Sequence, residues 1–337
     1  MNNKRWIAVG LSIVVFFSSL VVSFVGRILT QDAEKTSFWE ELMKDSIAET
    51  VIREGAYDER IALFNVRGAI MNMEESYFSV SQYNHQRILE SLETVKNDET
   101  IKGIILRVDS PGGGVYESAE LSDKIREVKA ARNIPIYVVM ESMAASGGYY
   151  ISAYADKIYA TNETITGSIG VIMSGMNYAG LLEKMGVEDM TIKSGDMKDV
   201  GSPTREITQK DLDVLQGLVD SMYERFIDVV SEGRELDRDY VYEIADGRIY
   251  DGAQAKDNGL VDDIGYYEEA LEDFEVEYGL ENAQIITYDQ VELDMFSQWF
   301  MKTSKIVNLG QEINVGNIKL PATWKEKTGF MYMYRGY

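Results

Sequence analysis

The sequence predicts an α/β protein built on a mostly parallel sheet. Its 337 residues are 45% hydrophobic, which is enough for a large core. Short apolar runs rich in β-branched residues alternate with longer segments whose apolar residues recur at helical spacing. This alternation is typical of βαβ units joined by right-handed crossovers. Because sites in such sheets lie at the carboxyl ends of strands, the strand-to-helix junctions are the first places to search for function.

The alternation begins at Ile61, where Ile61–Val66 has the pattern of a buried strand. Periodicity predicts helices over 84–95, 118–131, 151–155, 209–232, 238–244 and 251–258. Apolar runs predict further strands over 103–108, 135–140, 157–160, 171–173, 190–193 and 259–261. Each predicted strand up to 160 is separated from the next by a helix, so neighbouring strands are expected to pair in parallel.

The ends of the chain differ in composition from its middle. Residues 6–26 are apolar apart from four serines and are long enough to cross a bilayer as a helix. Lys4 and Arg5 precede this run, which predicts an N-terminus in the cytoplasm and a folded domain outside it. A cleavable signal peptide is the alternative. We therefore expect a cytoplasmic tip and single-pass anchor over 1–30, a charged helical stalk over 31–59, the folded domain over 60–290 and an extension over 291–337.

The composition excludes several kinds of chemistry. A net charge of −23 disfavours nucleic acid as a partner. The absence of cysteine excludes a thiol nucleophile, and a single histidine, His85, excludes a His-rich zinc site. Asp237–Asp239 begins like a calcium loop, but Val241 and Tyr242 stand where an oxygen ligand and a glycine are needed. We therefore expect solvated acidic surface, with no metal and no cofactor.

A small-residue turn, Met143–Tyr150, lies between a predicted strand and a predicted helix. It places Ser146 between two alanines and two glycines, where a substrate can approach closely. The N–H groups of a helix N-terminus can stabilise developing negative charge, which suits a nucleophilic serine. A helix N-cap serine in a tightly packed turn is the alternative.

A glycine run, Gly112–Gly114, follows another predicted strand. Consecutive glycines allow several backbone N–H groups to face one concavity, which would serve as an oxyanion hole for acyl transfer. The run is not a phosphate loop, because no Gly-Lys-Ser/Thr sequence closes it. A tight connection without a ligand is the other interpretation.

A nucleophilic serine needs a base, and His85 is a poor candidate because it opens a polar helix well before the site strands. We expect His85 to be an exposed surface residue. Lysine is the remaining common base for serine, and it acts when burial disfavours its charged form. Lys193 and Lys198 lie in the candidate region, where a solvated lysine is the alternative. Ser168 could orient a neutral amine, or could be an ordinary turn hydroxyl.

Five motifs, in this order along the chain, resemble those of the signal peptide peptidase A family in its short bacterial form. They are Leu106–Ala119, Ser142–Tyr150, Thr166–Val171, Lys193–Asp199 and Ala245–Gly252. The resemblance runs from about residue 60 to 290, and the expected N-terminal anchor also fits. It does not extend to the stalk or to the C-terminal extension.

The resemblance implies a ClpP/crotonase-like spiral of βαβ units with a Ser-Lys dyad. By motif, Ser146 would be the nucleophile, Lys198 the general base and Ser168 the residue that holds the lysine. The N–H groups of Gly113 and Ser146 would form the oxyanion hole. The family also implies a homo-oligomeric ring in which neighbouring subunits share each site. Its substrates would be remnant signal peptides or similar apolar peptides.

Two other functions remain open at the sequence level. An acyl-CoA hydratase or isomerase of the same fold would use carboxylates such as Glu117 or Glu141 for proton transfer. A non-catalytic membrane scaffold would assemble without chemistry at Ser146. The last seven residues, Met331–Tyr337, are apolar and rich in tyrosine. They suggest a self-inhibitory tail in a neighbour's groove, with a disordered terminus as the alternative.

Overall fold

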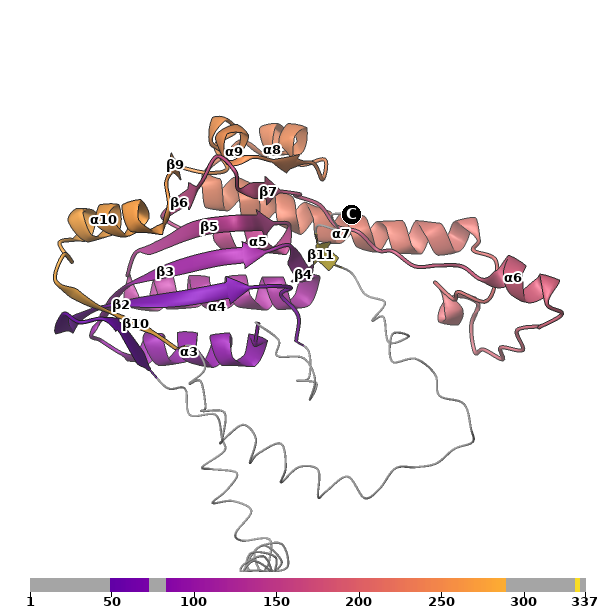
Figure 1. The fold of residues 1–337 in the computed structure, drawn as a ribbon. Coiled ribbons are helices and arrows are strands. Elements are labelled where there is room, and N and C mark those ends of the chain that lie inside the picture. Colours follow the sequence, from indigo (N-terminus) through magenta and orange to yellow (C-terminus); the bar gives the residue numbers. More distant parts are fainter. Residues whose placement is uncertain (1–48, 73–82, 289–330, 334–337) are drawn as a thin grey trace, which may run out of the picture. The chain divides into compact units, whose positions relative to one another are not determined.

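The structure is a computed structural model that describes residues 49–72, 83–288 and 331–333, and its fold is shown in Figure 1. The expected anchor over 6–26, most of the expected stalk and most of the C-terminal extension lie outside these residues. In the ranges that are described, no helix has both the length and the apolar character needed to cross a membrane.

A nine-stranded sheet organises the described part of the chain, in the order β1-β10-β2-β3-β5-β6-β9, with β7 beside β5 and β8 beside β7. All pairings except β1–β10 and β7–β8 are parallel, as the alternating pattern predicts. The strands are β1 (Thr50–Arg53), β2 (Ala56–Arg67), β3 (Ile101–Ser110), β5 (Ile136–Ala145), β6 (Lys157–Ala160), β7 (Ile165–Gly167), β8 (Ile249–Tyr250), β9 (Asp263–Ile264) and β10 (Ala283–Thr287). A mixed α/β fold with a central, mostly parallel sheet is thereby confirmed.

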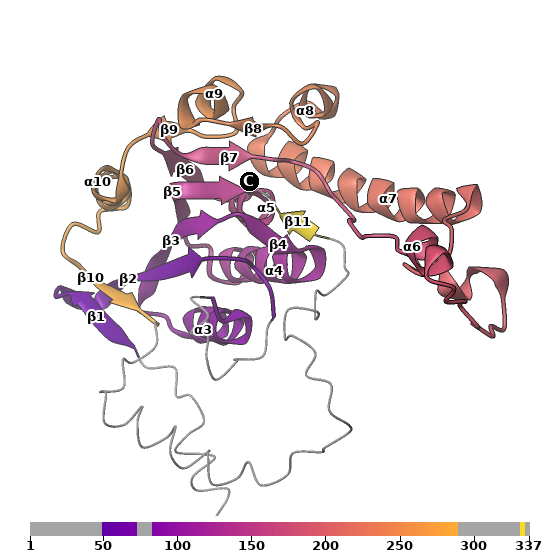
Figure 2. The same ribbon diagram turned by 45° about the vertical axis from the view of Figure 1, so that its right-hand side comes forward.

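Helices cover both faces of this sheet, as Figures 1 and 2 show. Helices α3 (His85–Asn97) and α4 (Val115–Arg132) lie along one face, and α10 (Tyr267–Tyr278) lies on the other. The α10 face has a buried aromatic cluster in which Phe274 packs edge-on against Tyr137, with ring centroids 4.9 Å apart. The remaining helices are α5 (Gly147–Ser152), α6 (Ala179–Lys184), the 3-10 helix η1 (Asp196–Asp199), α7 (Gln209–Arg234), α8 (Arg238–Ile244) and α9 (Gly252–Asp257).

A second, two-stranded sheet lies beside the main one. It pairs β4 (Gly112–Gly114) with β11 (Met331–Met333) in antiparallel orientation. Chain segments more than 200 residues apart in sequence therefore meet at the glycine run.

Several sequence predictions need correction. Residues 50–53, placed in a helical stalk, form β1 because they pair with β10, and β2 begins at Ala56, not at Ile61. In the described structure, residues 171–173 contain only an isolated bridge at Ile172, and residues 190–193 form no strand on an exposed arm. The last strand of the α9 region is β9, not 259–261.

The exposed arm is the chain from Val171 to Ile207, which links β7 to α7 and contains α6 and η1. In both views α6 lies beside the far part of α7, well away from the β5–α5 junction (Figures 1 and 2). The arm exposes large apolar side chains, including Met190 at 88% and Ile192 at 99%. Hydrogen bonds from Asn177 to the Arg205 carbonyl and from Thr204 to Asp189 join distant parts of the arm, but its large apolar side chains stay exposed.

Candidate active site

Ser146 lies at the junction of β5 and α5 in a strained backbone conformation. Its φ is 54° and its ψ is −116°, a region that costs energy for any residue other than glycine. The turn holds Ser146 just before the first residue of α5, and only 2% of the residue is exposed. A sharp, strained strand-to-helix turn is how many hydrolases present a nucleophilic serine.

An irregularity in β5 brings the strand to this point. Val108 of β3 faces Met140, but Ser110 faces Ala144, so β5 contains two extra residues between these pairs. Before the bulge β5 pairs with β6, and after it β5 pairs with β7. The bulge therefore turns the end of β5 toward β7, where the second predicted serine is located.

The glycine run is clamped by Ile70. The Ile70 N–H donates to the Gly112 carbonyl at 2.9 Å, and the Gly114 N–H donates to the Ile70 carbonyl at 2.9 Å. The N–H of the intervening Gly113 must then point away from Ile70, to the opposite edge of β4. A Cβ on Gly113 would come within 2.0 Å of the Ile70 carbonyl oxygen, so only glycine fits here.

The second expected oxyanion donor needs correction. The Ser146 N–H donates to the Gly167 carbonyl at 2.8 Å and is therefore committed to the β5–β7 pairing. Gly147, as the first residue of α5, has an N–H with no acceptor inside its helix. The position that a Gly147 Cβ would occupy lies 3.1 Å from the Gly113 nitrogen, so the two glycines are immediate neighbours. Gly147 is thus a donor candidate that the motifs do not assign, although the residue after a nucleophilic serine often supplies this N–H.

Ser146 and Ser168 line one pocket of about 310 Å³. Ser168 also has a positive φ, 49°, and its N–H donates to the Arg248 carbonyl at 2.7 Å. Across the pocket, hydrogen bonds from the Arg248 side chain and backbone lower the pKa of Asp246 to about 2. A carboxylate with so low a pKa is a poor general base at neutral pH. The pocket is completed by Gly170, Val171, Ile172, Gln216, Val219, Asp220, Tyr223, Ala245 and Gly247.

The two candidate lysines lie on the arm and are not among the residues that line the Ser146 pocket. Lys193 is held in a 2.8 Å ion pair with Asp199, which also pairs with Arg205 at 3.0 Å. This network shapes the loop that contains Lys198, whose side chain is exposed. Within one chain the structure therefore brings together Ser146, Ser168 and Gly113, but not Lys198.

His85 is buried, not exposed as expected. Only 3% of it is accessible, because its Nδ1 lies 2.6 Å from the Tyr83 hydroxyl and its Nε2 lies 2.9 Å from Glu120. These contacts place it between α3 and α4, and it does not line the Ser146 pocket. Its role in the described structure is to join two helices.

The carboxylates of the hydratase alternative also lie outside that pocket. Glu141 forms ion pairs with Arg67, at 3.2 Å, and with Arg107. Glu117 accepts a hydrogen bond from the Asn72 N–H at 3.3 Å. Glu117 also lies against the glycine run, since a Cβ on Gly114 would come within 2.0 Å of its Oε2.

The edge of β4 that faces away from Ile70 pairs with β11 of the same chain. Tyr332 lies opposite Gly113, with Met331 and Met333 opposite the flanking glycines. An extended segment thus lies on the edge to which the Gly113 N–H points. This backbone pairing is how a peptide is bound by strand addition.

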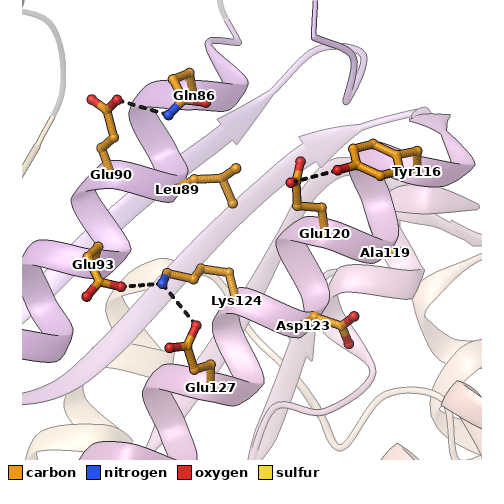
Figure 3. Close-up of a pocket in the computed structure, with 10 residues that line it drawn as sticks. All are labelled: Gln86, Leu89, Glu90, Glu93, Tyr116, Ala119, Glu120, Asp123, Lys124 and Glu127. Atoms are coloured by element: carbon orange, nitrogen blue, oxygen red, sulfur yellow. Dashed lines mark hydrogen bonds and ion pairs between the residues drawn. The ribbon is translucent and has the colours of Figure 1, made fainter.

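A larger pocket of about 620 Å³ lies between α3 and α4 and is shown in Figure 3. Half of its ten lining residues are acidic, and Lys124 bridges Glu93 and Glu127. No serine lines it, whereas Ser146 and Ser168 line the smaller pocket.

A strained serine beside a clamped glycine strand defines a hydrolase of the serine type that works by acyl transfer. Comparison with known proteins identifies the family. Residues 128–281 match the model of peptidase family S49. The chain belongs to this family and is a serine protease.

Two relatives and one solved structure illustrate the similarity. A protein of Enterococcus faecium, provisionally named signal peptide peptidase SppA, is 46% identical over 304 residues, which cover 89% of this chain and 88% of that protein. The chloroplastic serine protease SPPA of Arabidopsis thaliana is 31% identical over 216 residues, covering 63% of this chain and 32% of that one. A mutant ClpP1 from Listeria monocytogenes gives a TM-score of 0.41 at 17% identity, covering 62% of this chain and 94% of that one.

Proposed function

We propose that the protein is a membrane-anchored serine endopeptidase that uses Ser146 as nucleophile and Lys198 as general base. The observation that carries this proposal is the strained Ser146 turn beside Gly113, in a pocket whose lining residues include no histidine or lysine. Two carboxylates line that pocket: Asp246 is too weak a base, and Asp220 accepts a hydrogen bond from Gln216 at 2.6 Å. Lys193 is tied to Asp199. Lys198 is the base that the motif resemblance assigns, and it lies on an exposed loop.

In the first half-reaction, neutral Lys198 takes the proton of the Ser146 hydroxyl as Oγ bonds to the peptide carbonyl carbon. The Gly113 and Gly147 N–H groups hold the resulting oxyanion. The protonated lysine then donates to the leaving amine as the C–N bond breaks, which leaves an acyl-enzyme. Water, deprotonated by the same lysine, hydrolyses the acyl-enzyme. Ser168 holds the lysine amine in reach.

We propose further that Lys198 comes from the next copy in a homo-oligomeric ring. The arm that carries Lys198 lies away from the β5–α5 junction of its own chain (Figures 1 and 2). It also exposes Met190 and Ile192, side chains that an interface between subunits would cover. One contact between copies would therefore bury the arm and complete the pocket at Ser146.

The same proposal assigns a ClpP/crotonase-like spiral fold and a location outside the cytoplasmic membrane. The apolar run over 6–26 and the basic residues before it support the anchor and its direction. Remnant signal peptides and similar apolar peptides are the proposed substrates, supported by the motif resemblance and by the name of the Enterococcus relative. Such a peptide would bind as an added strand on β4, the edge where β11 pairs.

Complementation between inactive variants tests the shared site. Ser146→Ala and Lys198→Ala are each expected to remove peptide hydrolysis. When the two are co-expressed, half of the protomers keep the serine and half of their neighbours keep the lysine. Random mixing should therefore restore about a quarter of the sites. Zero recovery in verified mixed oligomers would place serine and base in one chain, and full activity of Lys198→Ala alone would remove Lys198 from the mechanism.

A serine-directed acylating probe tests the chemistry separately. Mass spectrometry of the intact protein should locate one adduct at Ser146, and Ser146→Ala should stay unlabelled. The non-catalytic scaffold and the hydratase alternatives both expect no adduct at this residue.

A further inference from the structure

Ser118 is a buried serine on α4 that the proposed mechanism does not use. It is 0% exposed, and its hydroxyl has no hydrogen-bond partner in the described structure. The residue lies four positions after Gly114, the N-cap of α4, so α4 carries it directly from the glycine strand. A buried hydroxyl without a partner lowers stability, because it loses its bonds to water and gains none in return.

The position of this hydroxyl relates it to the site. The point that a Gly147 Cβ would occupy lies 2.5 Å from the Ser118 Oγ, 3.1 Å from the Gly112 Cα and 3.1 Å from the Gly113 nitrogen. Ser118 Oγ therefore packs against the Cα of Gly147, beneath the two backbone segments that supply the proposed oxyanion donors. No other side-chain oxygen is among the nearest neighbours of that point.

Hydrogen bonds hold the backbone around this hydroxyl in place, whereas the hydroxyl itself can rotate. Gly112 and Gly114 are fixed by Ile70, and the Ser146 carbonyl accepts the Tyr150 N–H at 2.8 Å. The Gly147 peptide between them joins a strained residue to the start of a short helix. A serine hydroxyl can rotate and can either donate or accept a hydrogen bond. It is thus able to respond when charge develops at the neighbouring N–H groups.

We propose that Ser118 is a positioning residue for the oxyanion hole. Its hydroxyl forms a hydrogen bond with the backbone of the catalytic turn only when the oxyanion forms. This inference rests on the proposed roles of Gly113 and Gly147. The hydroxyl has no partner in the resting enzyme. The hydrogen bond therefore stabilises the transition state and not the bound substrate.

Ser91 provides a matched control. It is also a helical serine, 1% exposed, with a hydroxyl that has no partner in the described structure, but it lies on α3 and not beside the catalytic turn. Ser91→Ala and Ser118→Ala remove the same atoms from the same kind of environment. A purely structural role predicts that the two variants behave alike.

The test compares both variants with the wild type as full-length protein, in peptide hydrolysis, inhibition by a peptide boronate and thermal unfolding. Ser118→Ala should lower kcat about tenfold, with KM within twofold, because one hydrogen bond formed only in the transition state is lost. Boronate affinity, which reports the tetrahedral adduct, should fall by the same factor. Ser91→Ala should keep wild-type kinetics and inhibition, and neither variant should unfold at a lower temperature than the wild type.

Three results would overturn the inference. Wild-type kcat and boronate affinity for Ser118→Ala would show that the hydroxyl does not act in the site. A rise in KM at constant kcat would assign it to ground-state binding. A lower unfolding temperature for Ser118→Ala than for Ser91→Ala would mean that the hydroxyl is already paired in the resting enzyme. Activity of Ser146→Ala would instead refute the proposed function itself, so the two failures are distinguishable.

Discussion

The variants Ser146→Ala and Ser146→Gly differ in backbone freedom at one residue. Their relative stability tests whether the catalytic turn stores strain. At φ 54° and ψ −116°, a residue with a Cβ is destabilised by about 1–3 kcal/mol. Glycine relieves this strain. Two costs oppose this gain. Glycine carries an entropy cost of about 0.5–1 kcal/mol, and the loss of one buried methyl group costs about 0.8 kcal/mol. Relative to Ser146→Ala, the Ser146→Gly variant should therefore lose at most about 0.8 kcal/mol, less than these two costs alone would remove.

Ala145 supplies the control for these opposing costs. It is the neighbouring residue, fully buried and at the end of β5, and it does not have a positive φ. Ala145→Gly, made in the Ser146→Ala background, carries the same two costs with no strain to relieve, so it should lose about 1–2 kcal/mol. In a domain of this size 1 kcal/mol corresponds to about 2–4 °C in Tm. If the two glycine substitutions lowered Tm equally, the inferred strain at Ser146 would be refuted.

The remaining predictions concern the oxyanion strand, the lysine loop and the tail. Gly113→Ala should lower kcat about 10²–10³-fold, because its Cβ would displace the Ile70 clamp, whereas Gly217→Ala, with nothing within 4 Å, should leave hydrolysis unchanged. Hydrogen bonds from Arg205 and Lys193 hold the pKa of the Asp199 carboxyl at about 2. The contribution of this carboxylate to stability is therefore complete above about pH 4, near the unfolded pKa, and is lost as pH falls toward 2. Asp199→Asn should therefore lower kcat/KM by one constant factor from pH 6 to 9, and a factor that varies with pH would contradict this. Deleting the residues after Thr328 should raise turnover of short peptides, because β11 occupies the edge of the glycine strand; unchanged kinetics would show that the tail does not compete there.

The sheet and the positions of Ser146 and the glycine run could be predicted because each depends on a local pattern. Buried parallel strands are continuous apolar runs, and glycines and small residues at their carboxyl ends have few other uses. The exposed arm shows the limit of this reasoning. Residues 190–193 have the composition of a strand, but a strand forms only where a partner edge exists, and no pattern within the segment reveals that none is present.

His85 and Gly147 show two other kinds of limit. His85 follows polar residues and was expected at the surface, but Tyr83 and Glu120 satisfy both ring nitrogens and allow its burial. The Glu120 contact spans 35 residues, so the sequence around His85 contains no sign of it. The proposed donor role of Gly147 rests on the Ser146 N–H being bonded to Gly167, a fact of strand register that spacing along the chain does not determine.

The incomplete pocket and the apolar arm are two observations that one assumption explains. In the described part of one chain, no lysine or histidine lines the Ser146 pocket, and Ile192 on the arm is 99% exposed, which is costly in water. If a second copy receives the arm, the apolar surface is buried and Lys198 enters the Ser146 pocket in the same step. Removal of the amine from water then disfavours its charged form, which is what a lysine base requires. Assembly would thus bury the apolar surface of the arm and supply the neutral lysine amine, and a dissociated subunit would be unable to cleave peptides.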